Sequence, residues 1–239
     1  GGDDILVFTA AAQGSSDTLS LRPAMTGVET IAIQTTNSTT SDHANGLVSL
    51  NLVDASGVTT ITTNGHGAND VSVTNAGAVT SLVLGGGADT DADDVTLDAA
   101  TDLVVENSEA VGTTNAGNLT IDSAASLVLE HGHASAINFA TLSADAATSI
   151  EIGGGLDGAG TTAVKVATIE ADEVTTLTLD ASDSSILLDN ITADKLATIT
   201  ITGDNAVTLG EDANGSDATV ATVALANVPA GAATAAVKL

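Results

Sequence analysis

The stretch Val174-Thr-Thr-Leu-Thr-Leu179 returns 22 residues later as Leu196-Ala-Thr-Ile-Thr-Ile201. In both stretches apolar and polar residues alternate, and β-branched residues are frequent. This pattern is typical of a β-strand that has one face buried and one face in water. The two stretches therefore predict equivalent strands in successive units of a repeat.

The same alternation recurs along most of the chain. Further copies are Val28–Ile33, Val58–Thr63, Val79–Leu84 and Val220–Leu225. Corresponding apolar positions are separated by 21 to 24 residues in the two series Ile61, Leu82, Val104 and Leu177, Ile199, Val223. We expect these six side chains to point into the core and to lie in register.

A repeat of 21–25 residues with two or more short strands has the length of one coil of a β-solenoid, in which each strand pairs in parallel with its equivalent one repeat away. The alternative is an antiparallel β-sandwich or barrel. Tight two-residue turns are scarce, however, and long connections such as 85–93 and 153–162 are present. The sequence predicts an all-β fold, a parallel β-solenoid with coils of about 21–25 residues and acidic lateral loops. Helix is expected only as a minor component, for example in the Ala-rich stretch Ala134–Ala147. Residues 1–239 are expected to form one continuous domain, a fragment of a longer chain.

The charge of the chain limits its partners. It has 31 acidic and 4 basic residues, a formal net charge of −27. Such a polyanion repels nucleic acid and anionic membrane surfaces and attracts cations. Disorder is not expected, because 43% of the residues are hydrophobic and they recur in strand-like runs. No apolar run approaches the ~20 residues of a membrane-spanning helix.

Two absences describe the core. The chain has no Trp or Tyr and only two Phe, at positions 8 and 139, so the core must be thin and built from aliphatic side chains. It also has no Cys, which excludes disulfides, thiolate metal sites and a cysteine nucleophile. In an extracellular protein another means of stabilisation is then needed, and a bound divalent metal is the obvious candidate.

The opening Gly1-Gly2-Asp3-Asp4-Ile5-Leu6 resembles the end of an RTX nonapeptide, G-G-x-G-x-D-x-U-x. With Gly27–Ile31, Val53–Ile61 and Leu97–Ala100, the chain is similar in style to bacterial RTX surface-layer proteins, which leave the cell by type I secretion. The resemblance implies a secreted, calcium-dependent solenoid that self-assembles into a lattice on the cell surface, with residues 1–8 as the end of an RTX array. It also implies contact with cell-surface polysaccharide through a region outside this fragment. A large RTX adhesin that binds a surface or glycan is the near alternative.

The acidic segment Gly85–Asp94 is the main candidate for a calcium site. Calcium takes six to eight oxygen ligands, and carboxylates on a glycine-rich loop can supply them together with backbone carbonyls. The candidate ligands are Asp89, Asp91, Asp93 and Asp94. They do not have the spacing of an EF-hand, and the alternative is a solvated acidic loop.

Weaker metal candidates lie elsewhere. Asp3 and Asp4 form one pair, and Glu211, Asp212 and Asp217 form a group in a Gly/Asn-rich loop. Asp180, Asp183 and Asp189 flank a predicted strand, where capping of turns is the favoured role. His131 and His133 lie two residues apart, but with His43 and His66 in separate loops and no Cys, surface positions are favoured over a zinc site.

No enzymatic activity is expected. The chain contains no G-x-S-x-G elbow, no P-loop lysine and no H-E-x-x-H motif. A polysaccharide-acting β-helix enzyme is the remote alternative, but such enzymes hold sugar with aromatic and basic residues, and this chain has very few of either.

Overall fold

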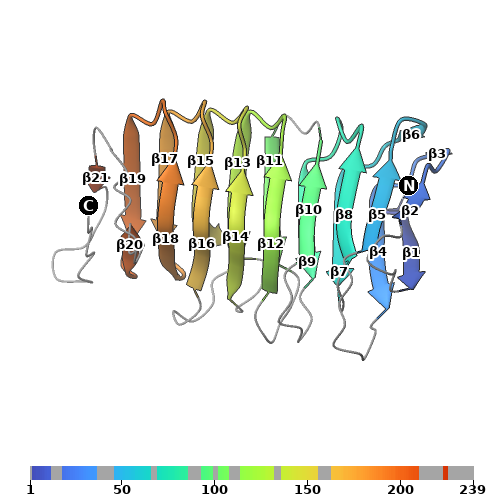
Figure 1. Cartoon of the computed structure of the whole chain (residues 1–239), viewed down its shortest axis with the longest axis horizontal. Helices are drawn as coiled ribbons and strands as arrows, with labels where there is room; N and C mark the ends of the chain where they lie inside the picture. The colour runs from blue at the N-terminus through green and yellow to red at the C-terminus, as the bar shows by residue number, and fades with distance from the viewer. Residues whose placement is uncertain are drawn as a thin grey trace.

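The computed structural model describes residues 2–11, 18–36, 46–65, 69–85, 93–98, 102–107, 114–131, 136–155, 163–209 and 223–225. Its strands form an elongated stack of coils with two large sheets on opposite sides (Figure 1). Successive strands of the chain alternate between the two sheets, so each sheet receives about one strand per coil. The first coil lies at one end of the long axis and the last at the other.

Sheet A has ten strands, in the order β1 (Ile5–Ala11), β4 (Thr30–Thr36), β7 (Thr60–Gly65), β9 (Ser81–Gly85), β11 (Asp102–Asn107), β13 (Ser126–His131), β15 (Ser149–Gly155), β17 (Thr176–Ala181), β19 (Thr198–Gly203) and β21 (Val223–Leu225). Sheet B has nine, in the order β2 (Thr18–Leu21), β5 (Gly46–Asn51), β8 (Asn69–Thr74), β10 (Asp93–Leu97), β12 (Thr114–Ile121), β14 (Ile137–Ser143), β16 (Ala163–Glu170), β18 (Ser185–Thr192) and β20 (Val207–Leu209). The short strands β3 (Met25–Thr26) and β6 (Ala55–Ser56) form a third sheet in the first two coils.

Neighbouring strands are parallel in all three sheets, which confirms the predicted all-β parallel solenoid. Most coils have the predicted length: paired residues differ by 21 between Thr60 and Ser81 and by 25 between Ile5 and Thr30. Two coils are longer, because Thr30 pairs with Thr60 and Ser149 pairs with Thr176. The described residues contain no helix, and the stretch Ala134–Ala147, expected as a source of helical turns, instead contains β14.

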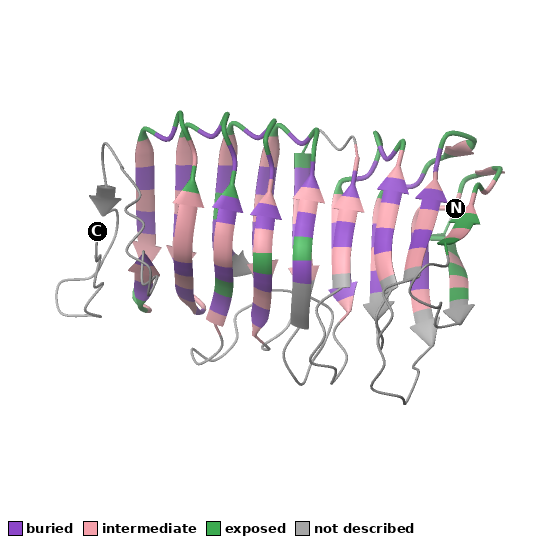
Figure 2. Cartoon of the chain, in the orientation of Figure 1, coloured by how far each residue is buried: buried purple, intermediate pink, exposed green. Residues whose placement is uncertain are grey.

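The core is a stack of aliphatic rows, because alternate residues of each strand point between the two sheets. In sheet A one row contains Ile31, Ile61 and Leu82, each fully buried. A second row contains Leu177 and Ile199, each at most 1% exposed, and Val223 continues it in register. The alternation of buried and partly exposed residues is visible along the strands in Figure 2. These five positions confirm the expected spacing of the core rows.

Val104 is the exception, and its predicted inward direction is wrong. Val104 pairs with Ser81 and Val128 on the outer face of sheet A, where it is half-buried. Its neighbours Leu103 and Val105 point inward and are at most 1% exposed, and Val105 is the residue that pairs with Leu82. Because side chains in a strand alternate, an error of one residue reverses the face.

The turns from sheet B to sheet A repeat one hydrogen-bonding pattern. The backbone N–H of Val79, Ala147, Val174 and Leu196 each donates to the carbonyl oxygen three residues earlier, at 2.8 to 3.2 Å. After each turn, threonine hydroxyls link adjacent coils. Thr148 Oγ1 donates to the carbonyl of Ala125 at 3.2 Å, and Thr175 Oγ1 donates to that of Thr148 at 3.2 Å. These contacts hold this edge of the solenoid in register.

Candidate functional site

The predicted calcium loop is only partly covered by the structure. Asp89 and Asp91 lie outside the described residues. Asp93 begins β10, and its side chain is likewise not described; the sheet register shifts between Asp93 and Val95. Asp94 is therefore the one member of the predicted set whose surroundings can be specified.

Asp94 belongs to a polar row on the outer face of sheet B, formed with Asp70 and Asn118. The Asp94 backbone N–H donates to Asp70 Oδ1 at 3.1 Å, and the Asn118 backbone N–H donates to Asp94 Oδ1 at 2.7 Å. Each aspartate thus accepts a hydrogen bond from the backbone of the following coil. One oxygen of Asp94 is engaged in holding adjacent coils together, which is a structural role that the sequence reasoning did not assign to it.

Burial affects Asp70 in this row. Partial desolvation raises the pKa of the Asp70 carboxyl, and the nearby Asp94 charge adds to the effect, whereas the hydrogen bond from the Asp94 backbone opposes it. The row therefore combines backbone capping with some repulsion between its carboxylates.

The remaining predicted ligands do not converge where they are described. Asp3 and Asp4 are exposed at the start of β1, and the Asp4 backbone N–H donates to Glu29 Oε2 at 2.9 Å. Glu211, Asp212 and Asp217 lie outside the described residues. Within the part of the chain that the structure describes, no group of three or more His, Asp or Glu side chains is arranged to hold a metal ion.

Asp180 caps a turn, as favoured from the sequence. Its Oδ1 accepts hydrogen bonds from the Ser182 backbone N–H at 3.1 Å and from Thr202 Oγ1 at 3.1 Å, which ties the turn after β17 to β19. Asp183 and Asp189 are half-buried nearby in the chain. Among the histidines, His131 ends β13 but its side chain is not described, and His43, His66 and His133 lie outside the described residues.

A row of aspartates follows the edge where the chain passes from sheet B to sheet A, and the sequence reasoning missed it. Thr96 pairs with Thr120, Thr120 with Ser143, Ser143 with Glu170 and Glu170 with Thr192. Two residues after each of these comes an aspartate, in five consecutive coils. The row consists of Asp98, Asp122, Asp145, Asp172 and Asp194. Asp98 is half-buried and the other four are exposed. Adjacent coils are ~4.8 Å apart, so this aspartate row is a regular line of negative charge.

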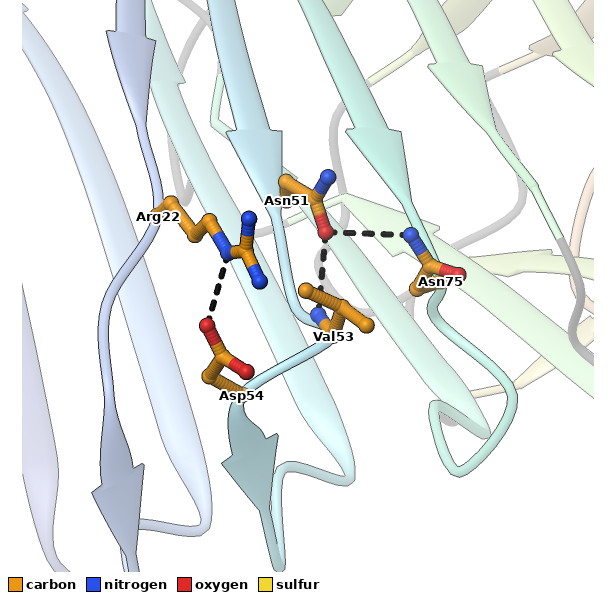
Figure 3. Close-up of polar contacts among 5 residues, drawn as sticks. All are labelled: Arg22, Asn51, Val53, Asp54 and Asn75. Carbon is orange, nitrogen blue, oxygen red and sulfur yellow. Dashed lines mark hydrogen bonds and ion pairs between the residues drawn. The ribbon is translucent and has the colours of Figure 1, made fainter.

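Few cations of the chain offset these charges. Arg22 Nε contacts Asp54 Oδ2 at 2.7 Å between the first two coils, and Asn51 Oδ1 accepts from the Val53 backbone and from Asn75 Nδ2, both at 3.0 Å (Figure 3). Further along the same edge, Lys195 Nζ contacts the Glu173 carboxylate at 2.5 Å. These pairs are exposed and contribute little stability. They consume two of the four basic residues, so the rows of carboxylates remain strongly negative.

A second acidic group lies on the outer face of sheet A. Glu106 pairs directly with Glu130, and Glu151 lies diagonally across on the next strand, opposite Val128. Partial burial raises the pKa of the Glu130 carboxyl, and the Glu106 and Glu151 charges raise it further. A carboxyl whose pKa is higher in the folded chain destabilises the fold once it ionises. The penalty begins as the pH rises through the unfolded value near 4.5 and is complete above the folded pKa.

Glu130→Gln is therefore expected to stabilise the protein at pH 7. The gain should be a few tenths of a kcal/mol, because like charges opposite each other in a sheet cost roughly 0.2–1 kcal/mol and solvent screens part of this. The measurement is thermal unfolding at pH 7 and at pH 3.5, where the gain should nearly vanish. Glu170→Gln is the control, since Glu170 is exposed and pairs with Ser143 and Thr192. An equal or lower melting temperature for Glu130→Gln at pH 7 would show that the repulsion is negligible.

The described residues contain no helix of the length and apolarity needed to cross a membrane. Comparison with known proteins gives no match, since no protein-family model, curated protein or solved structure is similar to this chain. What is shown is therefore the fold, a parallel β-solenoid with carboxylate rows on its exposed surfaces.

Proposed function

We propose that this chain is a structural segment of a secreted bacterial surface-layer protein of the RTX type, which self-assembles into a calcium-dependent lattice outside the cell. The observation that supports this most is the regular stack of parallel coils whose exposed edge repeats an aspartate in five consecutive coils. Such a stack is stiff and extends by addition of like units, which suits a structural rather than a catalytic role.

Assembly of this chain requires a cation from solution. Two copies with a formal net charge of −27 each repel one another, and two of the four basic residues are already paired with Asp54 and Glu173. Monovalent salt screens this repulsion without joining carboxylates, whereas one calcium ion coordinates several oxygens at once. A divalent ion therefore suits the lattice better than ionic strength alone.

The described residues do not by themselves form a calcium site, and Asp94 already accepts a backbone hydrogen bond. In this proposal the ions are held by the loops that carry Asp89, Asp91 and Asp93 and by the group Glu211, Asp212 and Asp217, and by contacts between copies. The aspartate row contributes the negative potential that concentrates divalent cations at the surface.

Calcium is expected to raise the melting temperature of the purified chain, because a ligand that binds only the folded state stabilises it by mass action. The expected gain is ~2.7 kcal/mol at a hundredfold excess over the dissociation constant. Thermal unfolding is measured in calcium, in chelator, and in sodium chloride with chelator, and the last should not restore the gain.

The triple variant Asp89→Asn, Asp91→Asn and Asp93→Asn should lose part of the calcium-dependent gain. The matched control is Asp122→Asn, Asp145→Asn and Asp172→Asn, which removes the same charge from the aspartate row. If both triple variants respond to calcium as the unmodified chain does, the loop is solvated and binds no ion. Identical melting in calcium and in chelator would remove calcium from the proposal altogether.

A further inference from the structure

The two ends of the solenoid differ in how well their terminal coils are covered. At the N-terminal end the inward-facing residues Leu6, Phe8, Leu19 and Leu21 are only partly buried. Their partners one coil further in are Ile31, Ile33, Val48 and Leu50, and all four are at most 1% exposed. At the other end of sheet B, Val207 and Leu209 in β20 are 1% and 4% exposed. Figure 2 shows the same difference, with β1, β2 and β3 lacking the buried bands of later strands.

The N-terminal end is also the edge of both large sheets. β1 is the outermost strand of sheet A and β2 the outermost strand of sheet B. An outermost strand presents backbone N–H and C=O groups that can pair with another strand. On the outer face of β1, Ile5 is 63% exposed and Val7 is 49% exposed, the two largest apolar exposures in a described strand.

Neither edge strand carries the features that usually prevent pairing. The sequences of β1, Ile-Leu-Val-Phe-Thr-Ala-Ala, and β2, Thr-Leu-Ser-Leu, contain no charged residue and no proline. Natural sheets protect exposed edges with lysine, proline or bulges, so an uncharged apolar edge is a surface that binds another strand. In a chain of this net charge, an uncharged end is also where a second copy meets the least repulsion.

We infer that this N-terminal end is a dimer interface, at which β1 and β2 of one copy pair with β1 and β2 of a second copy about a two-fold axis. The inference extends beyond the calcium-dependent lattice, because the interface is apolar and requires no ion.

Geometry favours the two-fold arrangement over stacking of one end on the other. The open, partly buried apolar residues occur at the N-terminal end, whereas Val207 and Leu209 near the opposite end are already covered. An interface that uses the same surface on both copies closes at two subunits. A two-fold axis perpendicular to the solenoid makes the paired strands antiparallel. This arrangement places Asp3 and Asp4 of one copy beside the far end of the other copy's β1, away from the other Asp3 and Asp4.

The dimer is tested by sedimentation velocity of the unmodified chain in chelator over a range of micromolar concentrations. The expected result is a reversible dimer. Val7→Lys should weaken the dimer at least tenfold, because it places a charge on the middle of the edge strand. Val104→Lys is the matched control, since Val104 lies on the same outer face of sheet A but in a central strand, and it should leave the dimer unchanged.

A second measurement holds even if Val7→Lys destabilises the fold. The chain has no cysteine, so Val7→Cys introduces a unique thiol. Under mild oxidation Val7→Cys should form disulfide-linked dimers in chelator, and Val104→Cys should not. A monomer at all concentrations, equal cross-linking of both variants, or growth beyond a dimer in chelator would overturn the inference. A dimer in chelator without any lattice in calcium would support this interface and contradict the proposed function, so the two can be judged separately.

Discussion

Val105→Asp is expected to unfold the central coils, while Val104→Asp is tolerated. Val105 is fully buried between the sheets, and an unpaired carboxylate there costs several kcal/mol, comparable to the total stability of a domain, about 5–15 kcal/mol. Val104 is half-buried on the outer face, where a carboxylate keeps its contact with water. The measurement is thermal unfolding followed by circular dichroism.

The expected difference between the two variants is about 10 °C or more, since 1 kcal/mol shifts the melting temperature of a chain of this size by about 2–4 °C. Leu177→Asp should behave like Val105→Asp, because Leu177 is 1% exposed in an equivalent inner row. Equal melting temperatures for Val104→Asp and Val105→Asp would mean that the strand faces are assigned incorrectly.

Gly203→Ala is expected to destabilise the protein by about 2–5 kcal/mol, from left-handed backbone strain of about 1–2 kcal/mol plus overpacking of about 1–3 kcal/mol. Gly203 ends β19 with a φ of +88°, and an added Cβ would lie 2.2 Å from the carbonyl carbon of Ala181 and 2.3 Å from the backbone nitrogen of Ser182. Both atoms belong to the backbone of the adjacent coil and cannot move without disturbing the sheet.

Gly27→Ala is the matched control for this clash. Gly27 also has a positive φ, +70°, but no atom lies within 4 Å of an added Cβ. Its cost should be about 1–2 kcal/mol, from backbone strain alone. Chemical denaturation of the two variants measures the difference. If Gly27→Ala were as destabilising as Gly203→Ala, strain rather than close contact between coils would determine the cost.

The fold could be predicted from the sequence because the strands repeat a simple alternation at a nearly constant spacing. The face of a strand could not be predicted where that alternation fails. In Asp102-Leu-Val-Val-Glu106 three apolar residues are adjacent, so both faces are apolar. The spacing of 22 residues from Leu82 favoured Val104, whereas the strands pair Leu82 with Val105. The two longer coils, which begin at Thr30 and Ser149, were missed for a related reason, since strand spacing does not record the length of a lateral loop.

The acidic surface was only partly predictable. The search for metal ligands favoured aspartates that are close in sequence, such as Asp89, Asp91 and Asp93. The aspartate row instead consists of residues 22 to 27 positions apart that the solenoid brings side by side. Alignment of the repeats would have found it, because each member stands at the same place in its turn. The backbone-capping role of Asp94 has no sequence signal, because it depends on the register between β8, β10 and β12.

Electron microscopy of the purified chain in calcium and in chelator tests the proposed surface-layer role most directly. The account predicts ordered two-dimensional arrays in calcium that disperse on addition of chelator, and that sodium chloride does not restore. The same unassembled rods in both conditions would contradict it and would leave a structural solenoid that does not form a lattice.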